Sequence, residues 1–278
     1  LNILLEELQP KKNILLLEND YPSLNWSFEN RDYHVHKLEI TKDVENDILN
    51  TIKKEDIDVL TLSLVQWIDG FKVELSFLQE LKKSNPNLII VADGTQFCGT
   101  TEFDFETSGI DVLGASAYKW MLSGYGNGFM LFSEHAKEEF KLNTIGFNAA
   151  NGDFGKKDAI GFAKKFEPGH LSCLNFGSLK HSIEFLEKIG IKNIAHHNNK
   201  LMQKAKEEFG ELGLLDSKII LRDVHSTIFN VKANEKEFDN LIDNGVFCAQ
   251  RGAGVRLSFH FYNNLDDIAT IVRFLKTA

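Results

Sequence analysis

The feature that most constrains the fold of this chain is a series of short apolar runs separated by segments long enough for helices. The runs lie at residues 13–18, 33–40, 58–65, 87–93, 110–116 and 128–132. The segment VELSFLQELKKSN, between the third and fourth runs, has apolar residues at helical spacing and lysines near its end, which predicts a helix. Alternating strands and helices predict an α/β fold with a mainly parallel, doubly wound sheet.

The pattern changes after about residue 150. A stretch rich in Gly, Lys and Asp predicts a long surface loop, and long loops in compact domains are often functional. Helical periodicity follows over 176–190 and 191–213. We predict a smaller C-terminal α/β unit with strands near 217–222, 226–232, 246–250 and 254–260 and helices near 234–244 and 264–276. The predicted domains are 1–180, a large domain, and 181–278, a small domain.

Composition and charge exclude several function classes. The chain has 278 residues, of which 43% are hydrophobic, and no apolar run approaches the length of a membrane span. A net charge of −9 argues against nucleic acid, because a phosphate-backbone binder needs a basic face. The three cysteines form no disulfide framework or metal-binding spacing, which favours a reducing cytoplasm. We therefore expect a cytoplasmic protein without a membrane or nucleic-acid partner.

The first residues, LNILLEELQPKKN, have neither the basic start nor the small-residue cleavage site of a signal peptide. They also lack an initiator methionine. We expect the N-terminus to be truncated, so that the chain begins partway into a longer protein.

Polar residues that follow the apolar runs are the candidates for a site, because ligands bind such sheets beyond the carboxyl ends of the strands. Asp93 follows LIIVA directly, and Gln96 comes three residues later. Asp93 could also simply begin a turn before Gly94. Lys119 ends the next run, between two aromatic residues and before a glycine-rich loop. A partly desolvated lysine there has its charged form disfavoured, which frees an amine for Schiff-base chemistry.

The combination ADGTQ, SAYK and GYGNG resembles the aminotransferase class V family, whose members have the fold-type I architecture and use pyridoxal 5′-phosphate (PLP). That family includes cysteine desulfurases, selenocysteine lyases and kynureninase. GVRLSFHFYN, at 254–263, resembles the family's C-terminal arginine segment, and FEPGH, at 166–170, lies where the family often has Glu-x-Gly-Thr. The resemblance covers essentially the whole chain, with its motifs in the right order.

The resemblance implies a role for each matching residue. Lys119 would form the Schiff base with PLP, and Asp93 would pair with the pyridine nitrogen, keeping it protonated. Gln96 would donate a hydrogen bond to the phenolic oxygen of the ring. Arg256 would bind the substrate carboxylate, since a guanidinium matches a carboxylate in a bidentate manner. The hydroxyls that would bind the phosphate are those of Ser116 and Tyr118.

Two aromatic residues have less decisive patterns. Tyr21, in ENDYPSLNW, could stack on the cofactor ring, or it could be a turn residue before Pro22. Trp67, in LVQWIDG, could line the substrate pocket, although tryptophan is more often a core residue. Both alternatives stay open at this point.

The sequence departs from the family pattern at three places. His170 replaces the threonine that contacts the phosphate of the neighbouring subunit. The early Gly/Thr-rich phosphate turn has no counterpart. Cys248 lies in a predicted strand rather than on the loop that carries the nucleophilic cysteine of desulfurases, and we interpret it as structural.

The resemblance implies an amino-acid substrate and a homodimer with its site at the subunit interface. We predict an enzyme that acts on an amino acid through a Lys119 Schiff base, by transamination or by β-elimination or side-chain cleavage. The alternative is a catalytically silent protein of the class V fold that serves as an interaction subunit. No histidine pair has the spacing and additional ligands of a metal site, so we predict none.

Overall fold

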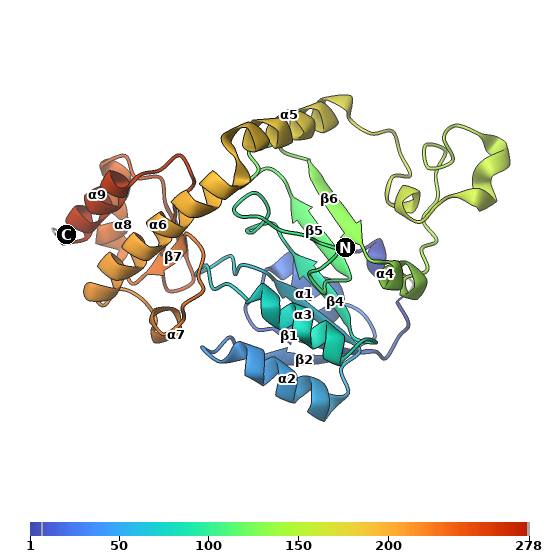
Figure 1. The fold of residues 1–278 in the computed structure, drawn as a ribbon, viewed down its shortest axis with the longest axis horizontal. Coiled ribbons are helices and arrows are strands. Elements are labelled where there is room, and N and C mark those ends of the chain that lie inside the picture. The colour runs from blue at the N-terminus through green and yellow to red at the C-terminus, as the bar shows by residue number, and fades with distance from the viewer. Residues whose placement is uncertain (7, 277–278) are drawn as a thin grey trace.

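The computed structural model describes residues 1–6 and 8–276 (Figure 1). The strands are β1 (Asn13–Leu17), β2 (His34–Leu38), β3 (Val59–Ser63), β4 (Ile89–Asp93), β5 (Val112–Ser116), β6 (Gly128–Phe132), β7 (Ile228–Val231), β8 (Ala249–Arg251) and β9 (Gly254–Ser258). The α-helices are α1 (Pro22–Glu29), α2 (Val44–Glu55), α3 (Leu75–Ser84), α4 (Glu134–Glu139), α5 (Cys173–Ile189), α6 (Ile191–Glu211), α7 (Ser217–Ile220), α8 (Glu235–Asp243) and α9 (Leu265–Lys276).

Six strands form one sheet in the order β2-β1-β3-β4-β5-β6. Strands β1 to β5 pair in parallel, and β6 pairs with β5 in the antiparallel direction. The sheet is therefore mainly parallel, as the sequence predicted. Because the parallel strands share one direction, the residues at their carboxyl ends lie along the same edge of the sheet. In this register Ser63 of β3 lies beside Asp93 of β4.

The central strands are buried on both faces, and alternate residues enter different cores. Leu15 and Leu17 of β1 belong to a core cluster that also contains the apolar residues of α2 and α3. Ile14 and Leu16 belong to a second cluster, which includes residues of α1 and α4. The two layers of helices therefore cover opposite faces of the sheet, which explains why these strands are apolar at nearly every position.

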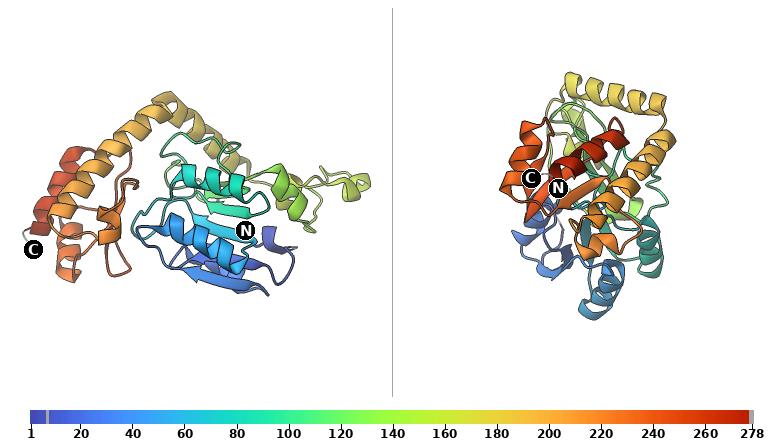
Figure 2. Two further views of the ribbon diagram at one scale, coloured as in Figure 1. Left: turned by 60° about the horizontal axis from the view of Figure 1, so that its bottom comes forward. Right: turned by 90° about the vertical axis from the view of Figure 1, so that its left-hand side faces the viewer.

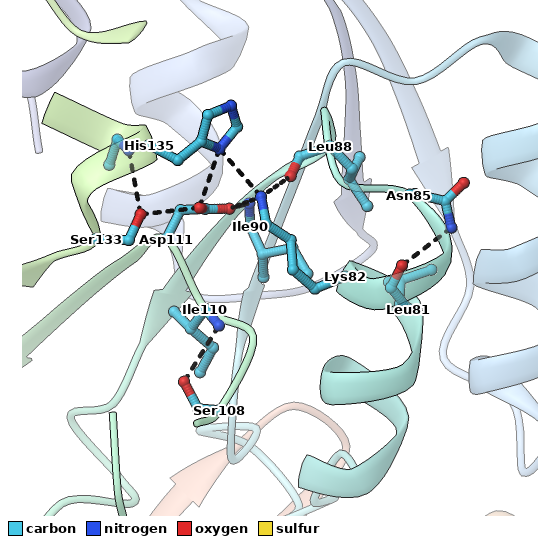
Figure 3. Close-up of polar contacts among 11 residues, drawn as sticks. Leu81, Lys82, Asn85, Leu88, Ile90, Ser108, Ile110, Asp111, Ser133 and His135 are labelled. Atoms are coloured by element: carbon cyan, nitrogen blue, oxygen red, sulfur yellow. Dashed lines mark hydrogen bonds and ion pairs between the residues drawn. The ribbon is translucent and has the colours of Figure 1, made fainter. Parts of the chain in front are cut away.

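A buried carboxylate, Asp111, ties the sheet to two helices at the edge opposite the carboxyl strand ends (Figure 3). Asp111 is 1% exposed and accepts hydrogen bonds from Lys82 Nζ at 2.8 Å and the Ile90 amide at 2.9 Å. Its other oxygen accepts from Ser133 Oγ at 2.9 Å and lies 3.2 Å from His135 Nδ1. This network connects β4 and β5 with α3 and the start of α4.

A second sheet of three antiparallel strands, in the order β7-β9-β8, follows helix α6 in the chain. Helix α9 packs against α6 and α8. The predicted domain boundary at residue 180 falls inside helix α5 and stays a prediction. Figures 1 and 2 place the second sheet at one end of the molecule and the segment around residues 145–170 at the opposite end.

Buried contacts join the two sheet regions. Arg222 makes a bidentate ion pair with Glu45, in which Nη2 lies 2.6 Å from Oε1 and Nη1 lies 2.8 Å from Oε2. His225 forms an isolated antiparallel bridge with Phe71. The first core cluster continues from the large sheet into α6, α9 and the second sheet, so the two regions share buried apolar surface.

Two predictions for the C-terminal unit need correction. The strand predicted at 217–222 is wrong, because Ser217–Ile220 forms helix α7. The side chain of Asp216 caps that helix by accepting a hydrogen bond from the Lys218 amide at 2.9 Å. The strand predicted at 246–250 is displaced to Ala249–Arg251, so Cys248 precedes it. The strands near 226–232 and 254–260 are confirmed as β7 and β9.

The long segment before α5 is a loop with two short 3-10 turns, at Phe154–Ala159 and Ala163–Phe166. It carries exposed apolar side chains, among them Phe154, which is 90% exposed. Across residues 1–6 and 8–276, no helix combines the length and hydropathy that crossing a bilayer requires.

Candidate active site

A cavity of about 700 Å³ opens at the carboxyl ends of β3, β4 and β5. Residues of the glycine-rich loop and the beginning of α5 complete its walls. Seven of the eight site residues predicted from the sequence line it: Tyr21, Trp67, Asp93, Gln96, Ser116, Tyr118 and Lys119. The fold therefore brings together side chains that are as far as 98 positions apart in the sequence.

Lys119 follows β5 and lies between two aromatic rings. Its Nζ is 5.8 Å from the ring centroid of Tyr21 and 5.8 Å from that of Tyr118. Burial lowers the pKa of Lys119, Asp93 opposes that shift, and Arg256 adds to it. At a given pH, a larger fraction of Lys119 is therefore in the neutral, nucleophilic amine form than for a solvated lysine.

Asp93 is the last residue of β4, at the edge where the sheet opens onto the cavity. Its Oδ1 accepts a hydrogen bond from the Thr95 amide at 2.8 Å, which fixes the turn that follows the strand. Thr95 Oγ1 in turn accepts from the Ser116 amide at 3.0 Å. The ends of β4 and β5 are therefore held in a fixed relation, with Asp93 and Lys119 in one cavity.

Gln96 is 7% exposed, and its side chain is fixed from behind. Its Oε1 accepts a hydrogen bond from Trp120 Nε1 at 2.8 Å. The indole of Trp120 stacks on His260, with ring centroids 5.0 Å apart. Since the carboxamide oxygen is engaged, the amide nitrogen is the group that Gln96 can offer as a donor to a ligand.

The glycines after Lys119 allow the backbone to close one wall of the cavity. Ser116 lies opposite Gly128 in the β5–β6 register. A Cβ at Gly128 would lie 2.9 Å from the carbonyl oxygen of Ala115, so only glycine fits there. Gly126 has φ +80°, a conformation that L side chains rarely adopt. The same loop carries Tyr125, whose ring stacks on Tyr118 with centroids 4.9 Å apart.

Tyr21 and Trp67 form one aromatic corner of the cavity. Their rings meet edge to face, with centroids 5.7 Å apart. Trp67 Nε1 donates to the Asn19 carbonyl at 3.2 Å, which orients the indole. Tyr21 is 38% exposed, and Trp67 is only partly buried. This partial exposure is typical of residues in a pocket wall rather than in the core.

Arg256 is the predicted residue that does not line the cavity. It lies in β9 of the second sheet, and its Nη1 donates to the Trp67 carbonyl at 2.9 Å. Burial lowers the pKa of Arg256, with a smaller contribution from Arg251. The guanidinium thus contacts the backbone of the aromatic corner, and its charge lowers the pKa of Lys119.

With this geometry established, comparisons with known proteins identify the family. The model of the aminotransferase class-V family matches residues 1–271. The chain belongs to the aminotransferase class V family. This membership confirms the class expected from the motifs, a PLP-dependent aminotransferase or lyase, with the reaction left open.

Class V relatives of this chain have different names. An uncharacterized aminotransferase of Schizosaccharomyces pombe is 24% identical, over 96% of this chain and 71% of its own length. A probable cysteine desulfurase of Methanothermobacter thermautotrophicus is 25% identical over 65% of this chain. The aligned region spans half of the desulfurase, 50% of its length.

Solved structures confirm the fold-type I architecture. A cysteine desulfurase from Thermococcus onnurineus superposes with a TM-score of 0.82 at 18% identity, covering 100% of this chain and 76% of the desulfurase. A cystine C-S lyase bound to cysteine persulfide also gives 0.82, at 15% identity, covering 99% of this chain and 78% of the lyase. Ureidoglycine-glyoxylate aminotransferase from Bacillus subtilis gives a TM-score of 0.75 at 14% identity, covering 99% of this chain and 75% of the aminotransferase. At these identities the likeness concerns the fold.

The structure shows where the residues that depart from the class V sequence pattern lie. His170 lines the cavity, close in the chain to Leu171 and Ser172, which also line it. Cys248 is partly buried just before β8, and burial raises the pKa of its thiol. Cys98 is more deeply buried, and burial raises its pKa to about 12. Among the described residues, none of the three cysteines lines the cavity.

Three residues of the site were not predicted. Thr95 links Asp93 to Ser116, and the sequence offered a signal for it, a threonine inside DGTQ. Ser63 lines the cavity at the end of β3, and Asp20 lies beneath it. Ser63 ends an apolar run and Asp20 follows another, but only the sheet order brings these two residues beside Asp93.

Proposed function

We propose that this protein is a PLP-dependent enzyme that acts on an amino acid, with Lys119 as the residue that holds the cofactor through a Schiff base. The observation that supports this most strongly is that a lysine with a lowered pKa and the carboxylate of Asp93 line one cavity. The reaction is transamination, or β-elimination or side-chain cleavage.

The chemistry of the donor set fits PLP. The cavity offers an amine at Lys119, a carboxylate at Asp93, and hydroxyls at Ser116 and Tyr118. When bound, PLP supplies an electron sink for negative charge at the substrate α-carbon. In this proposal Asp93 holds a proton on the pyridine nitrogen, because a nearby carboxylate favours the charged form of a base.

The remaining residues bind and orient. Ser116 and Tyr118 donate to the phosphate, and the Gln96 amide nitrogen donates to the phenolic oxygen. The ring of Tyr21 covers one face of the cofactor ring. Lys119, freed on substrate binding, takes and returns a proton at the substrate α-carbon.

Arg256 binds the substrate carboxylate in this proposal, and Trp67 forms a neighbouring part of the pocket wall. The charge of Arg256 lowers the pKa of Lys119, which supports a position near the cavity. The hydrogen bond from Arg256 to the Trp67 carbonyl uses one guanidinium nitrogen. An arginine has five N–H donors, so the others stay available for a bidentate contact with the carboxylate.

The cysteines favour chemistry without a protein persulfide. None of the three cysteines lines the cavity in the part of the chain that the structure describes. We therefore favour transamination or direct elimination over transfer of sulfur to a cysteine of this chain. Because one relative is named as a probable cysteine desulfurase, transfer of sulfur to a cysteine is also to be tested.

We also propose a homodimer, as the family resemblance implies. The loop and the start of α5 carry exposed apolar side chains, including Phe154 at 90%, Leu174 at 82% and Phe176 at 50%. Phe176 also lines the cavity. Exposed apolar groups concentrated in one segment are typical of an interface, and a second copy would cover them beside the site. Light scattering during size exclusion tests this, and a monomer at all concentrations would contradict it.

The visible spectrum of the purified protein incubated with PLP tests the main proposal. We expect a Schiff-base absorption band that sodium borohydride abolishes, and no such band in Lys119→Ala. The matched control is Lys72→Ala, since burial also lowers the pKa of Lys72 but its side chain lines a different, smaller cavity. The control should keep the band.

The absence of a band in the wild type would contradict the proposal and favour the silent interaction subunit. A band that persists in Lys119→Ala would reject Lys119 as the attachment residue. Screening amino acids for spectral shifts then identifies the substrate class. Formation of the oxo acid of the substrate with an amino-group acceptor indicates transamination, whereas release of ammonia or sulfide without an acceptor indicates elimination.

A further inference from the structure

Asp20 is a buried carboxylate next to the cavity that the proposed chemistry does not use. It lies between β1 and α1 and is 4% exposed. Burial of an aspartate is costly unless its oxygens receive hydrogen bonds and, usually, a cationic partner. Among residues 1–6 and 8–276, no lysine, arginine or histidine forms an ion pair with it.

Three neutral donors surround Asp20 instead. The Ser63 hydroxyl donates to Oδ1 at 2.5 Å and the Ser63 amide donates to Oδ2 at 2.7 Å. The Tyr21 amide donates to Oδ1 at 2.6 Å. Both partner residues line the cavity, Ser63 from the end of β3 and Tyr21 from the start of α1. Asp20 therefore controls the position of two groups in the site without lining it.

We propose that Asp20 is a positioning residue of the candidate active site, which fixes Tyr21 and directs the Ser63 hydroxyl according to its own protonation state. This inference rests on the proposed function, because it assigns the cavity to PLP. It concerns two residues of the cavity wall, one of which, Ser63, lies beside Asp93 in the sheet.

The hydrogen-bond directions follow from the donors available. When Asp20 is ionised, Ser63 must donate its hydroxyl hydrogen to Oδ1, which points that hydrogen away from the cavity. When Asp20 takes up one proton from solvent on Oδ1, its new O–H donates to Ser63 Oγ. Ser63 keeps its own hydrogen, which then points to the cavity. No covalent bond other than the O–H bond forms or breaks.

The surroundings of Asp20 raise its pKa, so that its protonation occurs at a pH that can be reached by titration of the folded protein. Burial raises the pKa of Asp20 to about 6, the bonds from Ser63 and Tyr21 oppose the shift, and the like charge of Asp93 on β4 adds to it. Ser63 and Tyr21 face Asp20 with uncharged donors. Asp93 in turn raises the pKa of Lys119, the lysine of the cavity.

The first measurement needs no cofactor. In apo protein labelled with ¹³C at the aspartate carboxyls, one resonance should titrate near pH 6 and be missing from Asp20→Asn. The matched control, Asp104→Asn, should keep it. Asp104 also accepts from a backbone amide and a hydroxyl, those of Glu106 and Thr107, but it is exposed and does not line the cavity.

The second measurement is the pH titration of the PLP absorption band. The wild type should show a transition near pH 6, whereas Asp20→Asn should show none. Its amide nitrogen can donate to Ser63 Oγ as a protonated carboxyl does, but it cannot accept from the Tyr21 amide. We expect Asp20→Asn to bind PLP about tenfold more weakly. Ser63→Ala should lose the spectral transition but keep the carboxyl titration.

The two proposals fail in different ways. A wild type without a PLP band contradicts the proposed function, whatever Asp20 does in the apo protein. A wild type with a band whose pH profile is unchanged in Asp20→Asn and Ser63→Ala overturns the role of Asp20. If Asp20→Asn does not fold, Ser63→Ala alone decides, since it leaves the carboxylate and its two amide donors intact.

Discussion

Asp111 and Asp20 are both buried aspartates of the same sheet region, but they lie at opposite edges and have different partners. Asp111, near the amino end of β5, has the cation of Lys82 at 2.8 Å and a backbone amide at 2.9 Å. Asp20, near the carboxyl ends of β1 and β3, has only uncharged donors and the like charge of Asp93 nearby.

This difference in partners distinguishes Asp111, a structural carboxylate, from Asp20, a carboxylate suited to a role in a ligand-binding site. A buried carboxylate with a cation and several donors has its burial compensated by these contacts, so it can hold elements together. A buried carboxylate without a cation keeps an unfavourable charge, so its protonation state responds to its surroundings. In sheets of this class the ligand edge is the carboxyl edge, which is where the uncompensated group lies.

The largest effect should follow from Asp111→Ala. The variant leaves Lys82 near the sheet without its carboxylate and removes acceptors from Ile90 and Ser133. We expect the free energy of unfolding to fall by about 4 kcal/mol, the range for breaking a buried pair. Urea denaturation measures this, and a loss below about 1 kcal/mol would show that Asp111 is not structural.

A smaller effect concerns the pH dependence of stability at Asp20. Its folded pKa of about 6 lies above the ordinary aspartate pKa of 3.8, so the stabilisation from the protonated form is complete below about pH 4 and is lost as pH rises through about 6. The unfolding free energy of the wild type should fall relative to Asp20→Asn over that window, by up to about 3 kcal/mol at 1.4 kcal/mol per pKa unit. Parallel curves for the two proteins would contradict the assignment.

Arg256→Lys tests the substrate side of the carboxyl edge. A lysine cannot make the bidentate contact of a guanidinium, so we expect KM for the amino acid to rise by roughly 30-fold, or about 2 kcal/mol. The PLP absorption band should stay unchanged, because Arg256 is assigned to the substrate carboxylate and a lysine keeps the positive charge that acts on Lys119. A loss of PLP binding with unchanged KM would contradict this assignment and indicate that Arg256 binds the cofactor instead of the substrate.

The smallest effect should come from Ser133→Ala, at the structural edge. Ser133 Oγ accepts from the Ala136 amide at 3.1 Å, which caps α4, and donates to Asp111. We expect a loss of about 1 kcal/mol in unfolding free energy, typical of a removed N-cap. PLP binding should not change; if it weakened, the two edges would be coupled through β5.

Much of the fold could be predicted because it depends on local patterns. The strands of the large sheet follow apolar runs that polar residues bound: Glu18 follows Asn13–Leu17, and Asp93 ends Ile89–Asp93. The segment 217–222 was predicted wrongly, since IIL is apolar enough for a strand but Asp216 caps a helical turn. Side-chain capping of so short an element overrides its apolar content.

The candidate site was partly predictable for the same reason. Asp93, Gln96 and Lys119 stand next to strand ends in the sequence, and family motifs connect them. Asp20 and Ser63 carry no such motif. Their importance arises from hydrogen bonds between residues 43 positions apart, which depend on β1 and β3 being neighbours in the sheet.

The sequence by itself determined the class of fold and the chemistry of the central residues, because strand and helix periodicity and motif spacing are local properties of the chain. Only the tertiary structure decided which side chains share the cavity, that Trp120 donates to Gln96 and that Arg256 donates to the Trp67 carbonyl. The physical reason is that burial, electrostatic fields and long-range hydrogen bonds depend on which elements pack together, and these set the properties of Lys119 and Asp20.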